Sequence, residues 1–305
     1  MKLVSFADGR AGIDLGQQIL DIQKTAAKNQ DFKDIPVSVL ELIRSASAFA
    51  KLTKFISSAQ IDDPNKFVLV DKGQAELSAP FEPLTIYAVG MNYTDHLEEM
   101  ETPTPSRPYS FVKSSSSVIG NGQPIILPKD HESMVDWEAE LAIVIGKKGY
   151  QVSEAEALSH VFGYMCANDI SARDWAGNAL DQATPLVTIE RWACNLLGKQ
   201  YPTFAPLGPA LVTSDEVNDP TKLDIQCRVN GAVMQKSNTS KMVFGVAKLV
   251  SYLSQFQMLR PGDVILSGTM GGVGFGRNPK LFLKPGDVVE VEVEKLGILK
   301  NQVKI

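Results

Sequence analysis

Trp137-Glu138-Ala139-Glu140-Leu141-Ala142-Ile143-Val144-Ile145-Gly146 is the sharpest signal in this sequence. Read as a β-strand, it places successive side chains on opposite faces of a sheet. One face then carries Trp137, Ala139, Leu141, Ile143 and Ile145, and the other carries Glu138, Glu140, Ala142 and Val144. The stretch therefore predicts a strand that is apolar on one face and places two carboxylates beside apolar residues on the other.

These two carboxylates need a compensating charge if their face is partly buried. Like charges on such a surface repel each other and lose hydration. A divalent ion such as Mg²⁺ or Mn²⁺, held by a few carboxylates and water, would supply that charge. The alternative is a solvated outer face, of which the alternation of Glu290, Glu292 and Glu294 with valines is typical. The spacing alone leaves both interpretations open.

Outward from this strand, the chain has the pattern of a β-rich α+β protein. Short strands are predicted between Gly and Pro turns at residues 125–127, 139–145, 210–212, 225–229, 264–267 and 288–293. Helices are predicted after Pro36, after Ser153 and over residues 240–254. Pro80 and Pro83 mark a boundary. We therefore expect a small N-terminal α+β domain, residues 1–78, and a larger β-rich domain, residues 79–305.

Composition and charge argue against several classes of function. The 305 residues are 44% hydrophobic and 21% charged, which is typical of a globular protein. A formal net charge of −5 provides no broad basic surface for nucleic acid, and no apolar run approaches the roughly 18 residues of a membrane span. Charged residues come too early for the core of a signal peptide. Three widely spaced cysteines fit no metal or disulfide pattern, so we expect a reduced, cytoplasmic protein.

A third candidate carboxylate, Asp169, stands where a predicted apolar strand ends. From the end of a strand a side chain can enter a cleft. Arg173, four residues later, offers a planar fork for the carboxylate of a substrate. The alternative is a capping aspartate that pairs with Arg173 for structural reasons.

His96 is one of only three histidines. On a short helix, His96 and Glu99 would be neighbours at positions i and i+3. A carboxylate beside an imidazole raises its basicity and fixes its tautomer, which suits a general base that activates water. A surface helix with ordinary charge pairs is the alternative.

The glycine-rich segment 267–276 resembles a phosphate loop in composition only. It lacks the Lys-Ser/Thr that follows in such loops, so we do not predict a nucleotide site. We expect instead that its backbone lies close to a small ligand, with Thr269 as a hydrogen-bond donor. Lys113 and Lys199 carry no motif of their own, and on residue pattern alone both are more typical of the surface than of a site.

Taken in order, nine motifs over residues 86–305 resemble the fumarylacetoacetate hydrolase family. They are Gly90-x-Asn92-Tyr93-x-x-His96-x-x-Glu99, Phe111-x-Lys113, Glu138-x-Glu140-Leu141, Gly163-Tyr164-x-x-x-Asn168-Asp169-x-Ser171-x-Arg173-Asp174, Ala205-Pro206-Leu207-Gly208-Pro209, Val229-Asn230-Gly231, Leu259-x-Pro261-Gly262-Asp263, Gly268-Thr269-x-x-Gly272-Val273-Gly274 and Leu283-Lys284-Pro285-Gly286-Asp287. None is specific alone, but the ordered set is. Residues 1–78 match only as a small, variable domain.

The resemblance implies a rolled mixed β-sheet in the catalytic domain, a homodimer, and Mg²⁺ or Mn²⁺ as cofactor. It implies metal ligands at Glu138, Glu140 and Asp169, a water-activating dyad on a lid at His96 and Glu99, Lys199 near the metal, and substrate contacts from Arg173, Lys113 and Thr269. The activity implied first is hydrolytic C–C cleavage of a 2-oxo or 1,3-diketo acid, such as an acylpyruvate, through an enolate that the ion stabilises. Oxaloacetate decarboxylation, isomerisation of a dienoate diacid, or action on a secondary metabolite are the alternatives on the same scaffold.

The sequence departs from the family pattern in three places. Ala176 stands where members often have Gln, Gln200-Tyr201-Pro202 replaces Ser-Phe-Asp, and Met270 replaces Pro. Because alanine offers no hydrogen bond, we expect a substrate that is bulkier or less polar at that end. A metal-binding module without turnover would have been signalled by loss of His96, Glu99 or Lys199, and none is lost.

Overall fold

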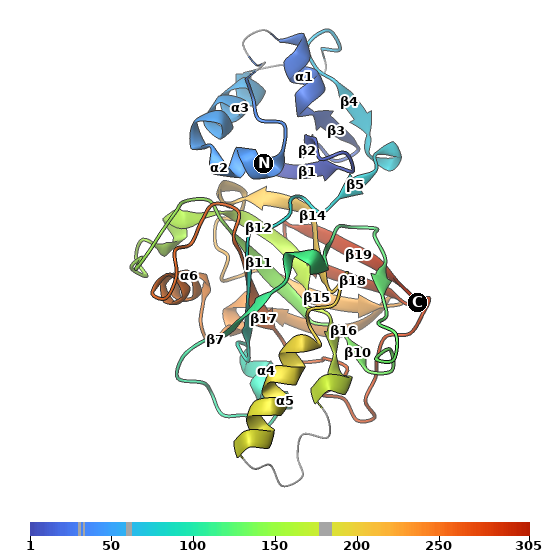
Figure 1. Ribbon diagram of the computed structural model, residues 1–305. Helices are drawn as coiled ribbons and strands as arrows, with labels where there is room; N and C mark the ends of the chain where they lie inside the picture. The colour runs from blue at the N-terminus through green and yellow to red at the C-terminus, as the bar shows by residue number, and fades with distance from the viewer. Residues whose placement is uncertain (30–31, 33, 59–62, 177–184) are drawn as a thin grey trace.

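The computed structural model describes residues 1–29, 32, 34–58, 63–176 and 185–305. Figure 1 shows the N-terminal segment, in blue, above a larger body in which two sheets lie against each other. Helix α5 (Pro185–Leu197) lies at the far end of this body from the N-terminal segment. Strands dominate the body and three pairings are parallel, so the predicted β-rich α+β fold with mixed sheets is confirmed.

The larger sheet runs through the whole molecule. In spatial order its strands are β4 (Leu69–Asp71), β3 (Gln18–Asp21), β2 (Ala11–Asp14), β1 (Lys2–Phe6), β14 (Ala205–Thr213), β12 (Val161–Asn168), β11 (Ala139–Ile145), β17 (Val264–Thr269), β6 (Ile86–Gly90) and β7 (Tyr109–Lys113), with β5 (Leu77–Ser78) paired to β1 and β8 (Val118–Ile119) to β14. Because β1 pairs with β14, one ladder of backbone hydrogen bonds joins residues 1–78 to the rest. The division into two domains at residue 78 stays a prediction.

A second sheet packs on one face of the first. Its strands are β16 (Ala232–Asn238), β15 (Asp224–Val229), β18 (Val288–Val293), β19 (Gly297–Lys304) and β9 (Ile125–Ile126), and a separate pair joins β10 (Val135–Asp136) to β13 (Ser171–Ala172). The other helices are α1 (Ile22–Lys28), α2 (Val39–Arg44), α3 (Ala46–Ser58), α4 (Thr94–Glu99) and α6 (Val246–Ser254). Within the described residues, no helix is long and apolar enough to span a lipid bilayer.

Strand β11 is buried along its whole length and lies at the centre of the body. One face contributes Trp137, Ala139, Leu141, Ile143 and Ile145 to the core between the two sheets. Ala142 and Val144, on the other face, belong to a second core that includes residues of α2 and α3. The predicted alternation is therefore confirmed. The predicted outer face of β18 is confirmed as well, since Val289, Val291 and Val293 are buried while its glutamates stay partly exposed.

Several helix predictions need correction. The segment after Pro36 forms two helices, α2 and α3, because α2 ends at Ser45 in an extended conformation. Helix α6 begins after Gly245 rather than at residue 240, since Phe244 N donates to the side chain of Asn92 instead of continuing a helix. After Ser153 the chain forms turns and a short 3₁₀ helix, Ala157–His160, instead of an α-helix.

Candidate active site

The three predicted metal ligands come from two neighbouring strands. Glu138 directly precedes β11, Glu140 lies within it, and Asp169 directly follows β12. Because β11 and β12 are antiparallel, with Ala139 opposite Asn168, the start of one strand lies beside the end of the other. All three carboxylates are buried, and each offers an oxygen within 4.8 Å of the others. The structure thus brings the three residues into one cluster.

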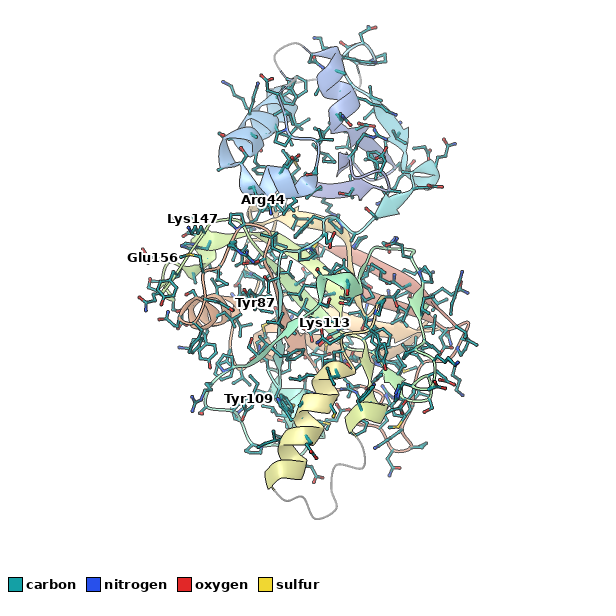
Figure 2. All side chains as sticks on the ribbon, in the orientation of Figure 1. Arg44, Tyr87, Tyr109, Lys113, Lys147 and Glu156 are labelled. Atoms are coloured by element: carbon teal, nitrogen blue, oxygen red, sulfur yellow. The ribbon has the colours of Figure 1, made fainter. Side chains whose placement is uncertain are left out.

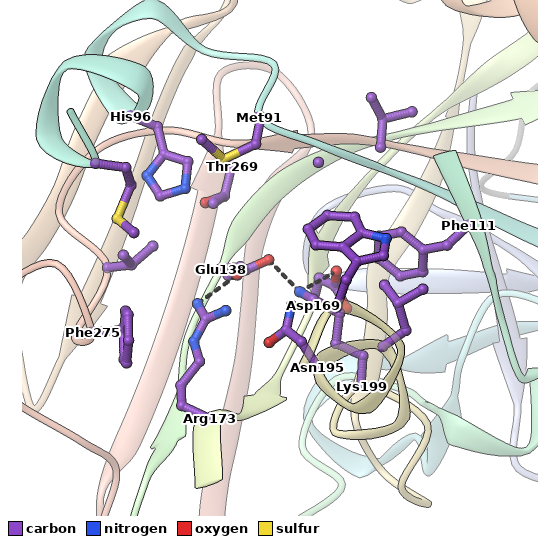
Figure 3. A pocket seen from close by; sticks show the side chains of 16 residues that line it. Met91, His96, Phe111, Glu138, Asp169, Arg173, Asn195, Lys199, Thr269 and Phe275 are labelled. Carbon is purple, nitrogen blue, oxygen red and sulfur yellow. Dashed lines mark hydrogen bonds and ion pairs between the residues drawn. The ribbon is translucent and has the colours of Figure 1, made fainter. Parts of the chain in front are cut away.

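Three buried cations surround the cluster, two of which Figure 3 shows beside Glu138. Lys199 Nζ lies 2.6 Å from Glu138 Oε2 and 2.8 Å from Asp169 Oδ2. Arg173 Nη2 lies 2.5 Å from Glu138 Oε1, and Lys113 Nζ lies 2.7 Å from Asp169 Oδ1. Lys113 and Lys199 are only 1% and 4% exposed, so the surface interpretation of both lysines is wrong. Figure 2 shows Lys113 inside the body. The ion pairs make their burial tolerable.

Asp136 is a fourth buried carboxylate of the site, and one that the sequence pattern did not single out. Its Oδ2 accepts hydrogen bonds from Arg173 Nε (3.1 Å) and Nη2 (2.9 Å), and its Oδ1 accepts one from Gly274 N (2.7 Å). The fork of Arg173 is therefore held by Asp136 and Glu138, not by Asp169 as the structural alternative supposed. The sequence did contain a signal for Asp136, because Asp136, Glu138 and Glu140 stand at every second position, as residues on one face of a strand do.

Burial and neighbouring charges set the protonation of these carboxylates. Burial raises the pKa of Glu138, but the Lys199 ammonium and the Arg173 guanidinium outweigh it and lower the pKa to about 2. Glu140 forms no ion pair within the described residues, and its Oε2 accepts one hydrogen bond, from Gly268 N at 2.7 Å. Burial, together with the charges of Asp169 and Glu138, raises the pKa of Glu140 well above its usual range.

Two observations show that the cluster fits a divalent cation. Among the described residues, the buried carboxylates of Asp136, Glu138 and Asp169 each pair with a buried cation, whereas the buried Glu140 has none. Asp169 Oδ1 is also buried without a hydrogen bond of acceptable angle, although Lys113 Nζ lies close to it. Carboxylate oxygens are the ligands that Mg²⁺ and Mn²⁺ prefer. Glu138, Glu140 and Asp169 would hold such an ion.

The predicted pair of His96 and Glu99 lies on helix α4, at the edge of the same site. His96 Nδ1 lies 3.2 Å from Glu99 Oε2. An ionised Glu99 can only accept, so Nδ1 is the donor of this contact, and in the neutral ring Nε2 then carries the lone pair. Glu99 Oε1 accepts a hydrogen bond from Gly272 N at 2.9 Å. Glu99 therefore joins His96 to the glycine-rich segment.

Glycines in this segment let helix α4 approach closely. A Cβ on Gly276 would lie 2.6 Å from Glu99 Cδ, and one on Gly271 would lie 3.1 Å from Asp95 O, and both of these contacted residues belong to α4. Thr269, in the same segment, lines the site, but its hydroxyl donates to Ala139 O at 2.9 Å. Donation from Thr269 to a ligand would require this hydrogen bond to be exchanged.

These groups open onto one cavity of about 350 Å³. The residues that line it include His96, Glu138, Asp169, Arg173, Lys199 and Thr269. Figure 3 shows His96 and Phe275 on one side of the two carboxylates, and Phe111, Asn195 and Lys199 on the other. Lys113 is not among the lining residues; it supports Asp169 from behind, so a direct substrate contact from Lys113 stays a prediction.

Helix α5 supplies lining residues that the sequence pattern did not single out. Trp192, Asn195 and Leu196 line the cavity together with Lys199. Their spacing of i, i+3, i+4 and i+7 was the available signal. Ala176 closes the 3₁₀ turn Arg173–Ala176, but its side chain lies outside the described residues, so the expectation drawn from it stays a prediction.

Comparison with known proteins identifies relatives of the whole chain. The family model described as "Fumarylacetoacetate (FAA) hydrolase C-terminal" matches residues 85–304. The chain is 41% identical over 315 residues to a protein of Xenopus laevis named oxaloacetate tautomerase fahd2, mitochondrial, covering 99% of this chain and 90% of the relative. A fumarylacetoacetate hydrolase from Exiguobacterium antarcticum superposes with a TM-score of 0.78 at 32% identity, covering 100% of this chain and 99% of the other. A maleylpyruvate hydrolase from Sphingobium sp. SYK-6, solved with manganese(II) and pyruvate, superposes with a TM-score of 0.77 at 28% identity and the same coverage.

Proposed function

The chain belongs to the fumarylacetoacetate hydrolase family, and from that premise we propose that it is a divalent-metal-dependent tautomerase that interconverts the keto and enol forms of oxaloacetate. The observation that carries the proposal is that His96, oriented by Glu99, lines the same cavity as Glu138 and Asp169. A proton-transfer group thus faces a site fit for an ion. Several relatives are named oxaloacetate tautomerases, which favours this reaction over others of the family.

Different residues of the cavity would have different roles in such a reaction. When bound by Glu138, Glu140 and Asp169, a divalent ion would polarise the 2-oxo group as a Lewis acid. Lys199 and Arg173 add positive charge to the wall against which an anionic substrate binds.

Proton transfer is the task of His96. Its Nε2 takes a proton from C3 of the keto form, or returns one to C3 of the enol. Glu99, through its contact with Nδ1, stabilises the positive charge that the ring then carries. The net change is the movement of one proton, so no water is consumed.

Hydrolytic C–C cleavage of an acylpyruvate is the second candidate. The same His96 and Glu99 would activate a water molecule instead of moving a substrate proton. The structural similarity to a maleylpyruvate hydrolase supports this alternative. Decarboxylation of oxaloacetate needs no base of this kind, so the role of His96 separates the reactions.

The test compares three reactions of the purified protein with Mg²⁺ or Mn²⁺. Ketonisation of enol oxaloacetate, release of carbon dioxide from oxaloacetate, and release of pyruvate from an acylpyruvate are each measured against the metal ion alone. We expect ketonisation to be accelerated most, and His96→Ala to reduce it roughly 10²- to 10⁴-fold.

Two outcomes would contradict the proposal. Acceleration of pyruvate release alone would establish the hydrolase. If the protein accelerated the release of carbon dioxide but not ketonisation, and if His96→Ala left that release unchanged, the protein would be a decarboxylase.

A further inference from the structure

Helix α5 lines one side of the cavity. Trp192, Asn195 and Leu196 lie on one face of α5, and Lys199 continues this stripe in the turn after the helix. Lys199 binds Glu138 and Asp169 at 2.6 and 2.8 Å, so the C-terminal end of the stripe belongs to the charged cluster. The preceding turn of α5 therefore faces the part of a substrate that extends away from that cluster.

The cavity is larger than a four-carbon diacid requires. Oxaloacetate, with nine non-hydrogen atoms, occupies on the order of 100 Å³, about the share of three or four water molecules in the liquid. The cavity measures about 350 Å³. If oxaloacetate binds beside Lys199 and Arg173, the part of the cavity next to Trp192 and Leu196 of α5 stays unfilled.

The chemistry of this remaining space is apolar. Phe111 lies on this side of the cavity and Leu196 of α5 also lines it, whereas Phe275 lies across the two carboxylates from them. Among the described residues that line the cavity, the only Lys and Arg side chains are Lys199 and Arg173, and both are bonded to Glu138. A second carboxylate reaching into this space would lose its hydration without gaining a cation, which is strongly unfavourable.

Two side chains of α5 lack partners that a ligand would provide. Trp192 is 48% exposed beside the cavity, and its ring centroid lies 6.3 Å from that of Tyr109, which is 50% exposed. Figure 2 shows Tyr109 beside α5. Half-exposed aromatic rings at the mouth of a cavity gain stability when an apolar group covers them. The side-chain amide of Asn195 makes no hydrogen bond to any described residue, so it is available to one polar atom of a ligand.

We propose that the site also takes 2-oxo acids whose third carbon carries an uncharged alkyl or aryl group, and that it tautomerises them. The 2-oxo acid end lies at the carboxylate cluster, and the substituent lies against Trp192 and Leu196. Trp192 is then a specificity-determining residue. This inference rests on the proposed tautomerase function and extends it to a second class of substrate.

The reaction is balanced without a co-reactant. In the enol of such an acid, the O–H bond at C2 breaks and its electron pair forms the C=O bond. The electron pair of the C=C bond takes up a proton and forms a C–H bond at C3. One proton leaves oxygen and one arrives at carbon.

Phenylpyruvate is the probe, since it is a 2-oxo acid with an uncharged aryl group on C3. Ketonisation of the enols of phenylpyruvate and oxaloacetate is measured with Mn²⁺, against Mn²⁺ alone. We expect the wild-type protein to accelerate both.

Trp192→Ala should lower kcat/KM for phenylpyruvate roughly 10-fold or more, while the value for oxaloacetate changes by no more than about threefold. Trp192→Phe should restore most of the loss. Ile189→Ala, on the same helix but 65% exposed and outside the cavity lining, is the matched control and should change neither value.

The outcomes separate this inference from the proposed function. Acceleration of oxaloacetate but not of phenylpyruvate would overturn the inference and leave the proposed function intact. Acceleration of neither enol would overturn the proposed function itself. Equal losses for both substrates in Trp192→Ala would show that Trp192 only positions Lys199, and would overturn its assignment as a specificity residue.

Discussion

Glu138 is the residue on which the charges of the site converge, since both Lys199 and Arg173 bind it. We expect Glu138→Gln to lower the affinity for Mn²⁺ or Mg²⁺ roughly 100-fold or more, because it removes one of three carboxylate ligands and leaves two cations facing a neutral group. Titration calorimetry measures this affinity. Glu290→Gln is the matched control, because Glu290 is paired with Arg228 on the partly exposed face of β18. Unchanged metal affinity in Glu138→Gln would disprove the assignment.

Glu140 makes metal binding depend on pH. Its pKa is raised well above the usual range by burial and by the charges of Asp169 and Glu138. Without metal, Glu140 therefore holds a proton at pH values where an exposed glutamate is ionised, and an incoming cation must displace that proton. Metal affinity should fall as the pH falls through the raised pKa. Calorimetry in two buffers of different ionisation enthalpy should show proton release on binding; binding without proton release, at constant affinity across pH, would contradict this account.

For single residues, local spacing placed Glu138 and Glu140 on one face, whereas the family resemblance was needed to add Asp169 to them. Glu138 and Glu140 could be placed on one face because strand periodicity is a local property. Asp136 contacts Arg173, which lies 37 positions further along the chain, and Lys113 contacts Asp169, which lies 56 positions further along. No local pattern encodes such pairs, so a buried lysine at the end of an edge strand resembled a surface lysine.

At the scale of elements, helix α4 and the glycine-rich segment act as one unit. In Gly276→Ala the new Cβ would lie 2.6 Å from Glu99 Cδ, so the Glu99 side chain must move away from His96. We expect kcat to fall to near the value of Glu99→Ala, with metal affinity unchanged. Gly245→Ala is the control, because a Cβ there meets no atom within 4 Å. Full activity in Gly276→Ala would show that the contact between Glu99 and His96 is dispensable.

The elements themselves were predictable where their faces are uniform. Strands β11 and β18 have the predicted bounds because alternation persists along each of them. Helix α5 was not predicted, although Trp192, Asn195 and Leu196 stand at helical spacing in the sequence. That this face lines a cavity depends on contacts with other elements, which local spacing does not encode.

At the scale of the whole molecule, the N-terminal segment completes both a sheet and a core. Strand β1 pairs with β14, and Leu3 and Ile13 share a core cluster with Val144 and Met165 of the body. We expect a fragment of residues 79–305 to aggregate, because it exposes the edge of β14 and half of this core. Size-exclusion chromatography against the full chain is the measurement. A monodisperse fragment that binds Mn²⁺ as tightly as the full chain would instead support an autonomous domain.

Assembly and location stay predictions at this scale. We propose a homodimer and a cytoplasmic protein, as the sequence indicated. Several relatives, by contrast, are named as mitochondrial proteins. Sedimentation of the purified chain and imaging of the tagged protein would test the two statements separately.

The proposed function is tested most directly by the rate of ketonisation of enol oxaloacetate with the Mn²⁺-loaded protein and with its His96→Ala variant. We expect a rate well above that of Mn²⁺ alone, with no more release of pyruvate or carbon dioxide than Mn²⁺ alone gives, and a loss of roughly 10²- to 10⁴-fold in the variant, with Mn²⁺ affinity retained. A rate equal to that of free Mn²⁺, or one that His96→Ala leaves unchanged, would contradict it.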